Sequence, residues 1–285
     1  MKNEYRELFE EYSRGRIDRR EFFRRLAVLA GGAASAAGLL SVLEGTRSYA
    51  QVIPMDDSRL DAGMITYPAG DIPMKAYQAR PKREGRFPGV IVIHENRGLV
   101  PHIKDVARRV ALEGYVAVAP DALSPFGGTP ADSNEARPLF QKLESAANIK
   151  NFTAAVAYLK THPRSTGKVG CMGFCWGGGV TNQVAVNAPD LNAAAPFYGS
   201  QPALEDVPKI KASMLLHYAG EDARINAGIP AYEEALKKAG VEFKTYMYEG
   251  AGHAFFNDTG TRYNKEASAL AWERTLAFFK DKLGG

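Results

Sequence analysis

From about Gln51 onward, short runs of apolar residues alternate with segments of helical character. The longer apolar runs are continuous, which is typical of strands buried on both faces of a sheet. The predicted strands cover residues 64–69, 74–79, 88–95, 115–121, 168–173, 193–199, 212–220 and 243–250. The predicted helices cover residues 101–113, 133–161, 176–188, 228–239 and 264–283. Alternation of strands and helices at this spacing predicts an α/β fold with a mostly parallel, doubly wound sheet.

The first two predicted strands are an exception to the parallel pattern. A Gly-Asp-Ile-Pro turn, residues 70–73, separates them and predicts an antiparallel pair. No internal repeat and no linker rich in Pro or Ser interrupts the chain after Gln51. We therefore expect residues 51–285 to form one domain.

The first fifty residues follow a different pattern. Two arginines, Arg19 and Arg20, precede two phenylalanines, and an apolar run rich in Ala and Gly follows over Leu26–Leu43. The small residues Ser48 and Ala50 then stand at the two positions that a signal peptidase inspects. This order predicts an export signal of the twin-arginine type over residues 1–50, with the export machinery and signal peptidase as partners and a periplasmic location.

A retained N-terminal segment is the alternative for residues 1–50. Asp18 and Glu21 have the spacing of a helix capping box, and Tyr5, Leu8 and neighbouring aromatics share one helical face. Such a segment would serve as a helical hairpin, a membrane anchor or an oligomerisation arm.

Charge and cysteine content exclude several classes of protein. Residues 1–50 hold nine Lys/Arg against seven Asp/Glu, and the remaining residues hold 27 against 25. This near balance argues against nucleic-acid binding. The two cysteines, Cys171 and Cys175, form no disulfide framework, and no His/Asp/Cys cluster has metal-ligand spacing. We expect no cofactor and a monomer or small homo-oligomer.

The stretch MGFCWGGG, residues 172–179, has the spacing of a nucleophile elbow with Cys175 at its centre. Gly173 and Gly177 flank the cysteine by two residues on each side, where a tight strand-turn-helix connection leaves no room for side chains. The helix start behind Cys175 is expected to lower the pKa of its thiol and to stabilise negative charge on an attacked carbonyl. A small buried thiol in a glycine-rich turn is the alternative interpretation.

A cysteine nucleophile needs a base and an acid to orient it. Among the histidines, His94 and His217 lie within apolar strands and are interpreted as core residues. His253 stands in a glycine-rich loop just after a strand, and Asp222 follows the preceding strand, with Glu221 as the competing acid. Cysteine, acid and histidine thus occur in the chain order of α/β-hydrolases, which favours nucleophilic catalysis.

Five stretches together resemble the dienelactone hydrolases of the α/β-hydrolase superfamily. These stretches are HENRG, GFCWGG, PFYG, GEDARI and GAGHAF, within a resemblance that covers about residues 60–285. The leader of residues 1–50 before the same domain is similar to that of an exported branch of the family.

The resemblance implies an α/β-hydrolase fold and a set of site residues. Cys175, Asp222 and His253 would form a catalytic triad, and Glu95 would help to manage the proton of the thiol. The backbone N–H groups of Asn96 and Trp176 would form the oxyanion hole.

The sequence departs from the family at the residues that grip the substrate. Family members that cleave dienelactone hold its carboxylate with two arginines, whereas this chain has none in PDALSPFGG, residues 120–128, and has Asn257 four residues after His253. Ala254 replaces a serine next to the histidine. Lost guanidinium groups remove charge-assisted contacts that neutral residues do not replace. Other residues are expected to line the substrate pocket: Arg97, Phe126, Tyr198, Arg224 and Phe255.

The sequence therefore predicts a cofactor-independent hydrolase that acts on a small ester or lactone, with dienelactone itself an unfavoured substrate. A phosphotriester or thioester hydrolase on the same triad is one alternative. A catalytically idle binding protein, anchored by its first fifty residues, is the other.

Overall fold

The computed structural model describes the chain except for residues 1–7, 9–18, 30–51, 71 and 285. The chain divides between Ala50 and Gln51 into two units. In the first unit, α2 (Arg19–Leu29) is described, and Glu21 pairs there with Arg24 and Arg25. Most of the apolar run of the expected export signal and all of its cleavage site lie outside the described residues. No helix in the described part of the chain is long and apolar enough to cross a membrane.

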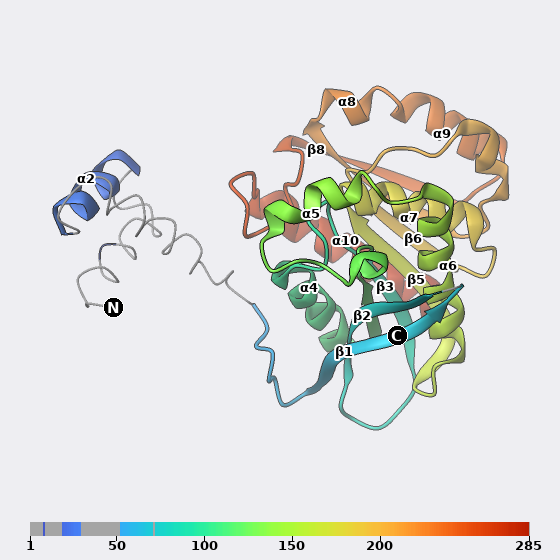
Figure 1. Ribbon diagram of the computed structural model, residues 1–285. Coiled ribbons are helices and arrows are strands. Elements are labelled where there is room, and N and C mark those ends of the chain that lie inside the picture. The colour runs from blue at the N-terminus through green and yellow to red at the C-terminus, as the bar shows by residue number, and fades with distance from the viewer. Residues whose placement is uncertain (1–7, 9–18, 30–51, 71, 285) are drawn as a thin grey trace. The chain divides into compact units, whose positions relative to one another are not determined.

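The second unit is built on one eight-stranded sheet with the order β1-β2-β4-β3-β5-β6-β7-β8 (Figure 1). The strands are β1 (Leu60–Ala69), β2 (Ile72–Pro81), β3 (Phe87–Ile93), β4 (Val116–Pro120), β5 (Ser165–Phe174), β6 (Ala193–Phe197), β7 (Ser213–Glu221) and β8 (Phe243–Gly252). β1 pairs with β2 and β2 with β4 in antiparallel fashion, and all other neighbours are parallel. The expected mixed, mostly parallel α/β sheet is confirmed.

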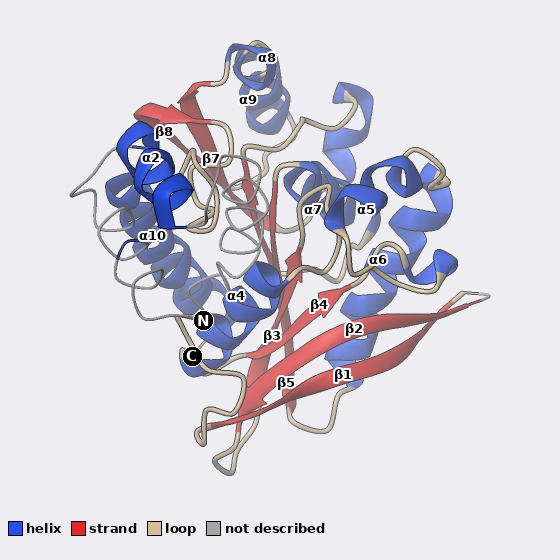
Figure 2. Ribbon diagram, turned by 60° about the vertical axis from the view of Figure 1, so that its left-hand side comes forward, coloured by secondary structure: helices blue, strands red, loops and turns tan. Residues whose placement is uncertain are grey.

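Helices cover both faces of this sheet (Figure 2). They are α4 (Pro101–Leu112), α5 (Ser133–Phe140), α6 (Ser145–Thr161), α7 (Trp176–Asn187), α8 (Ala223–Asn226), α9 (Ile229–Lys238) and α10 (Lys265–Leu283), with two 3-10 turns, η1 (Ser124–Phe126) and η2 (Leu204–Lys209). Ile91 and Ile93 of β3 pack in the apolar cluster with α6, α7 and α9, whereas Val90 and Val92 pack with α4 and α10. β3 is continuously apolar because both of its faces are buried.

The single helix expected over residues 133–161 is wrong. The structure has two helices, α5 and α6, separated at residues 141–144. After Phe140 the backbone N–H groups of Lys142 and Leu143 donate to carbonyls three residues back, and Glu144 has an extended backbone with φ −72° and ψ 118°. The helical hydrogen bonds therefore stop and begin again at α6.

A buried ion pair on α4 fixes the start of the second unit. The carboxylate of Asp105 accepts the backbone N–H groups of Val52 at 3.3 Å and Ile53 at 2.9 Å. The guanidinium of Arg108, which is fully buried, donates to Asp105 at 3.3 Å and to the carbonyl of Ile53 at 2.9 Å. These bonds hold the incoming chain against the helix.

The same helix also holds the loop that follows β8. Arg109 bridges Asp105 and Asp258, with 2.5 Å between its Nη2 and each carboxylate. His102 Nδ1 lies 3.0 Å from the other oxygen of Asp258. The loop that contains His253 and Asp258 is therefore anchored to α4.

We expect Asp105→Ala to lower the free energy of unfolding by about 3 kcal/mol, because it leaves the buried Arg108 without its acidic partner. Urea unfolding of the full chain measures the change. Asp190→Ala is the control, since its ion pair with Lys160 is on the surface and its side chain is 68% exposed. The control should cost less than about 1 kcal/mol. Equal losses of unfolding free energy in the two variants would show that the buried Asp105–Arg108 pair contributes no more to stability than a surface pair.

Candidate active site

Cys175 lies in the one-residue turn between β5 and α7 and has φ 56° and ψ −114°. This region of backbone space is strained for a residue with a side chain. A Cβ atom at Gly173 would lie 2.3 Å from the carbonyl oxygen of Gly177, and one at Gly177 would lie 2.4 Å from that of His94. Both positions therefore require glycine, as the elbow motif predicts.

Cys175, His253 and Asp222 lie in one hydrogen-bonded line. His253 Nε2 is 2.9 Å from Cys175 Sγ, and His253 Nδ1 is 2.5 Å from Asp222 Oδ2. An ionised carboxylate only accepts, so Nδ1 carries the ring proton and Nε2 faces the thiol as an acceptor. The competing acid, Glu221, is the exposed last residue of β7.

The fold brings these three side chains together because each follows a strand of the parallel part of the sheet. Cys175 follows β5, Asp222 follows β7 and His253 follows β8. The carboxyl ends of parallel strands share one edge of the sheet, which is where sites of open α/β folds assemble.

The thiol of Cys175 is held in its neutral form. Burial and the negative charge of Glu95, with a smaller effect of Asp222, raise its pKa to about 11. The N–H of Trp176 and the charge of Arg224 act in the opposite direction. The helix start thus lowers the pKa as expected, but burial and Glu95 outweigh it, so the net shift is upward. Burial also raises the pKa of Cys171 to about 12, and both cysteines are free thiols.

Asn257 holds the Glu95 carboxylate beside the thiol. Its Nδ2 donates to Glu95 Oε2 at 2.6 Å. Thr259 donates its hydroxyl at 2.6 Å and its backbone N–H at 3.1 Å to Asn257 Oδ1, which fixes the orientation of the amide. The sequence indicates Asn257 only as a departure from a family pattern, and its position four residues after His253 is the one local signal for this contact.

The expected pocket residues occupy different depths. Tyr198, with φ 38°, packs edge-on against His253 with ring centroids 5.2 Å apart and is 1% exposed. Phe255 is fully buried and packs behind Tyr198, so neither ring has the exposed place on the pocket surface that was expected. The other three, Arg97, Phe126 and Arg224, have exposed side chains after β3, on η1 and on α8.

The expected core histidines are buried as predicted. His94 and His217 are fully buried, and both of their ring nitrogens have hydrogen-bonding partners. Asn96 and Trp176 are partly exposed, and no backbone–backbone bond within the described ranges uses their N–H groups. The N–H of Trp176 instead hydrogen-bonds to the thiol of Cys175. In the part of the chain that the structure describes, no three His, Cys, Asp or Glu side chains group as metal ligands.

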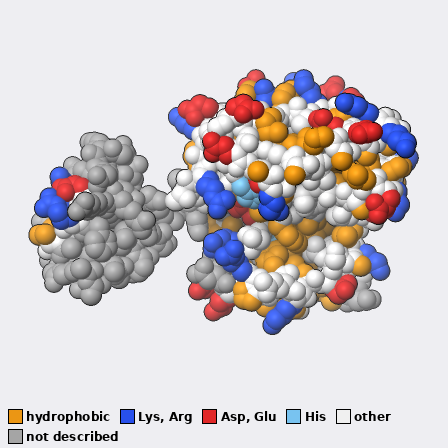
Figure 3. Space-filling view, turned by 90° about the horizontal axis from the view of Figure 1, so that it is seen from above, with side chains coloured by type: hydrophobic (Ala, Val, Ile, Leu, Met, Phe, Trp, Pro, Cys, Tyr) orange, Lys and Arg blue, Asp and Glu red, His pale blue; other side chains and the backbone are white. Residues whose placement is uncertain are grey.

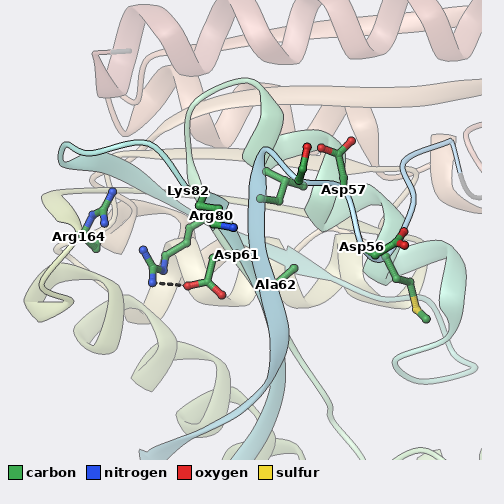
Figure 4. Close-up of a pocket in the computed structure, with 10 residues that line it drawn as sticks. Asp56, Asp57, Asp61, Ala62, Arg80, Lys82 and Arg164 are labelled. Carbon is green, nitrogen blue, oxygen red and sulfur yellow. Dashed lines mark hydrogen bonds and ion pairs between the residues drawn. The ribbon is translucent and has the colours of Figure 1, made fainter.

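The edge of the sheet that carries α8 is hollowed in the view from above (Figure 3). Hydrophobic side chains line the hollow, and a histidine with Lys and Arg side chains lies at its rim. A second hollow of about 430 Å³ contains the Asp61–Arg80 ion pair and Arg164 (Figure 4). Arg164 precedes the first residue of β5 and Cys175 follows the last, so the second hollow lies at the opposite end of that strand.

Comparisons with known proteins give a consistent result. A family model described as the dienelactone hydrolase family matches residues 74–283. A Synechocystis sp. protein named "Putative carboxymethylenebutenolidase" is 34% identical over 238 residues, which cover 77% of this chain and 96% of that protein.

Two solved structures are similar in fold. One is titled "Putative Dienelactone Hydrolase" from Klebsiella pneumoniae, with a TM-score of 0.70 and 30% identity over 77% of this chain and 98% of that one. The other is a dienelactone hydrolase-like promiscuous phosphotriesterase from metagenomic libraries, with a TM-score of 0.71 and 24% identity over 79% of this chain and 100% of that one. The second shows likeness of fold only.

We expect Glu95→Gln to shift the pH profile of Cys175 alkylation to lower pH, because removal of a negative charge favours the thiolate. Glutamine keeps an oxygen that accepts from Asn257. Below the pKa, each unit of decrease raises the thiolate fraction about tenfold. Iodoacetamide labelling from pH 6 to pH 11, followed by mass spectrometry, measures the shift.

The matched control is Glu113→Gln, an exposed carboxylate that follows the far end of α4. Its alkylation profile should coincide with that of the unmodified chain. An unshifted profile in Glu95→Gln would show that Glu95 does not control the thiol.

Proposed function

The chain belongs to the dienelactone hydrolase family, and we propose that it uses Cys175, His253 and Asp222 to hydrolyse a small ester or lactone without a cofactor. The line of hydrogen bonds from thiol to imidazole to carboxylate carries this proposal. It supplies a nucleophile, a base on the thiol and an acid that holds the base in one tautomer. A binding protein without catalysis has no need of this arrangement at a strained elbow.

In the proposed first step, the Cys175 thiol passes its proton to Nε2 of His253. Sulfur forms a bond to the carbonyl carbon, and the electron pair of the C=O bond moves to oxygen. The carbonyl then re-forms, the ester C–O bond breaks, and the leaving oxygen takes the proton from His253. The product is a thioester on Cys175, and Asp222 stabilises the transient imidazolium.

The second step releases the acid. His253 takes a proton from water as the water oxygen attacks the thioester carbon. The C–S bond breaks, and sulfur recovers the proton from His253. The N–H groups of Asn96 and Trp176 are proposed to hold the negative oxygen in both steps, as preorganised donors do in other acyl-transfer sites.

Glu95 is proposed to keep the thiol neutral until a substrate enters. Its charge and the burial of the site raise the pKa of Cys175, so the resting enzyme carries little thiolate. Oxidation of cysteine follows thiolate character and exposure. A neutral resting thiol would therefore be protected in an oxidising compartment.

The proposed substrate class is a small ester or lactone with an apolar acyl group. The hydrophobic hollow at the carboxyl edge supports this class (Figure 3). Arg224 is the exposed cation whose charge acts on Cys175. It stands where an acidic group on the substrate would be attracted. Paired neutral and anionic esters, lactones, thioesters and phosphotriesters form the panel that tests the class.

Cys175→Ala is expected to lower kcat/KM for the best ester of this panel by roughly 10³-fold or more, because only binding and oxyanion stabilisation remain. Cys171→Ala is the control, since Cys171 is fully buried in the apolar cluster of β5 and α7. Its activity should stay near that of the unmodified enzyme. Inactivation by labelling of Cys171 alone would refute the assignment of the nucleophile.

We also propose that residues 1–50 are an export signal that is removed after Ala50 and leaves the domain in the periplasm. Replacement of Arg19 and Arg20 by lysines should block translocation in a bacterium with a working twin-arginine pathway, because that pathway reads the paired arginines. Fractionation and intact mass decide the outcome. A periplasmic chain that still starts at Met1 would favour the retained anchor.

A further inference from the structure

His94 is a buried titratable residue to which the proposed mechanism gives no role. It follows the last residue of β3, and its side chain is fully buried. The backbone N–H of Ala122 donates to its Nε2 at 3.1 Å. That nitrogen therefore carries no proton, so in the neutral ring Nδ1 carries it. Nδ1 lies 2.7 Å from the carbonyl oxygen of Glu95 and donates to it.

This hydrogen bond fixes the direction of the next N–H group. The carbonyl of Glu95 and the N–H of Asn96 belong to one peptide unit, and no peptide bond in the described residues is cis. In a planar trans peptide the C=O and N–H bonds point in opposite directions. The bond from His94 that holds the carbonyl therefore also holds the Asn96 N–H, on the opposite side of the peptide.

The same ring also supports the elbow. It stacks on the indole of Trp176 with centroids 5.4 Å apart and an interplanar angle of 9°. Phe140 and Phe152 contact both rings edge-on. The Gly177 backbone lies directly on the His94 carbonyl, where no side chain would fit. One imidazole thus contacts both peptide segments that carry the proposed oxyanion donors.

We propose that His94 is a positioning residue that aligns the N–H groups of Asn96 and Trp176 for the same oxygen of the substrate. This inference rests on the proposed function. An apolar ring would fill the same space without the cost of burying two polar nitrogens. The two ring nitrogens satisfy the Ala122 N–H and the Glu95 carbonyl, and the second of these bonds also sets the direction of the Asn96 N–H.

The test compares two substitutions in the full chain. His94→Phe keeps a ring on Trp176 and removes the hydrogen bonds to the Glu95 carbonyl and the Ala122 N–H. We expect kcat for the best ester to fall about 10- to 100-fold, since a lost oxyanion donor costs 10²- to 10³-fold and here the donor is only misaligned. KM should change little. His94→Asn, whose Nδ2 can replace Nδ1 as the donor, should recover part of the lost kcat.

Two further readouts separate alignment from damage to the triad. Iodoacetamide reacts by direct displacement and forms no oxyanion, so Cys175 should alkylate at the same rate in His94→Phe. A trifluoromethyl ketone forms an anionic tetrahedral adduct with the thiol, so its affinity should fall in parallel with kcat. A loss of alkylation in proportion to kcat would overturn the inference, because it would show a distorted elbow.

His217→Phe is the matched control. His217 is equally buried, bonds to Tyr248 at 2.8 Å and Thr275 at 3.0 Å, and stacks on Phe197 with centroids 4.3 Å apart. None of these contacts involves Asn96 or Trp176, whose N–H groups are the proposed oxyanion donors. The kcat of this variant should therefore stay near that of the unmodified enzyme. An equal fall in this control, or full kcat in His94→Phe, would overturn the inference alone. Absence of Cys175-dependent hydrolysis in the unmodified enzyme would instead refute the proposed function.

Discussion

The close approach of backbones around the turn at Cys175 is the constraint on which the rest of the site depends. A Cβ atom at Gly178 would lie 2.4 Å from the carbonyl oxygen of Phe197, and Cβ atoms at Gly173 and Gly177 would meet backbone atoms equally closely. With no side chains between them, the start of α7 lies directly on the ends of β3, β5 and β6. This packing holds Cys175 in its strained conformation and brings the N–H of Trp176 to the thiol.

Two carboxylates act on the thiol in different ways. Asp222 bonds to His253 and holds its ring with Nε2 toward sulfur. Glu95 is held by Asn257 and makes the thiolate unfavourable by like-charge repulsion. Because Asn257 is a neutral donor, it orients this carboxylate without cancelling its charge. The site therefore combines a base that is ready to accept a proton with a thiol that retains its own.

The periphery of the domain contributes to the site through α4. Arg109 and His102 hold Asp258, which is the neighbour of Asn257 in the loop after β8. The same Arg109 and the buried Arg108 meet at Asp105, which also binds the start of the domain. Hydrogen bonds and ion pairs therefore link the start of the domain at Ile53, through Asp105 and Arg109, to the loop that carries His253.

Local features of the sequence determined the strands, the elbow and the chain order of Cys175, Asp222 and His253, because alternation of elements and glycine spacing are written in short stretches. Only the tertiary structure decided what depends on contacts between distant segments. The bond from Asn257 to Glu95 spans 162 positions, and the raised pKa of Cys175 results from burial that a local helix start does not reveal. The same holds for Phe255, whose apolar character suggested a pocket wall until packing behind Tyr198 buried it. Electrostatics and burial depend on the sum of neighbours in space, which a one-dimensional pattern does not contain.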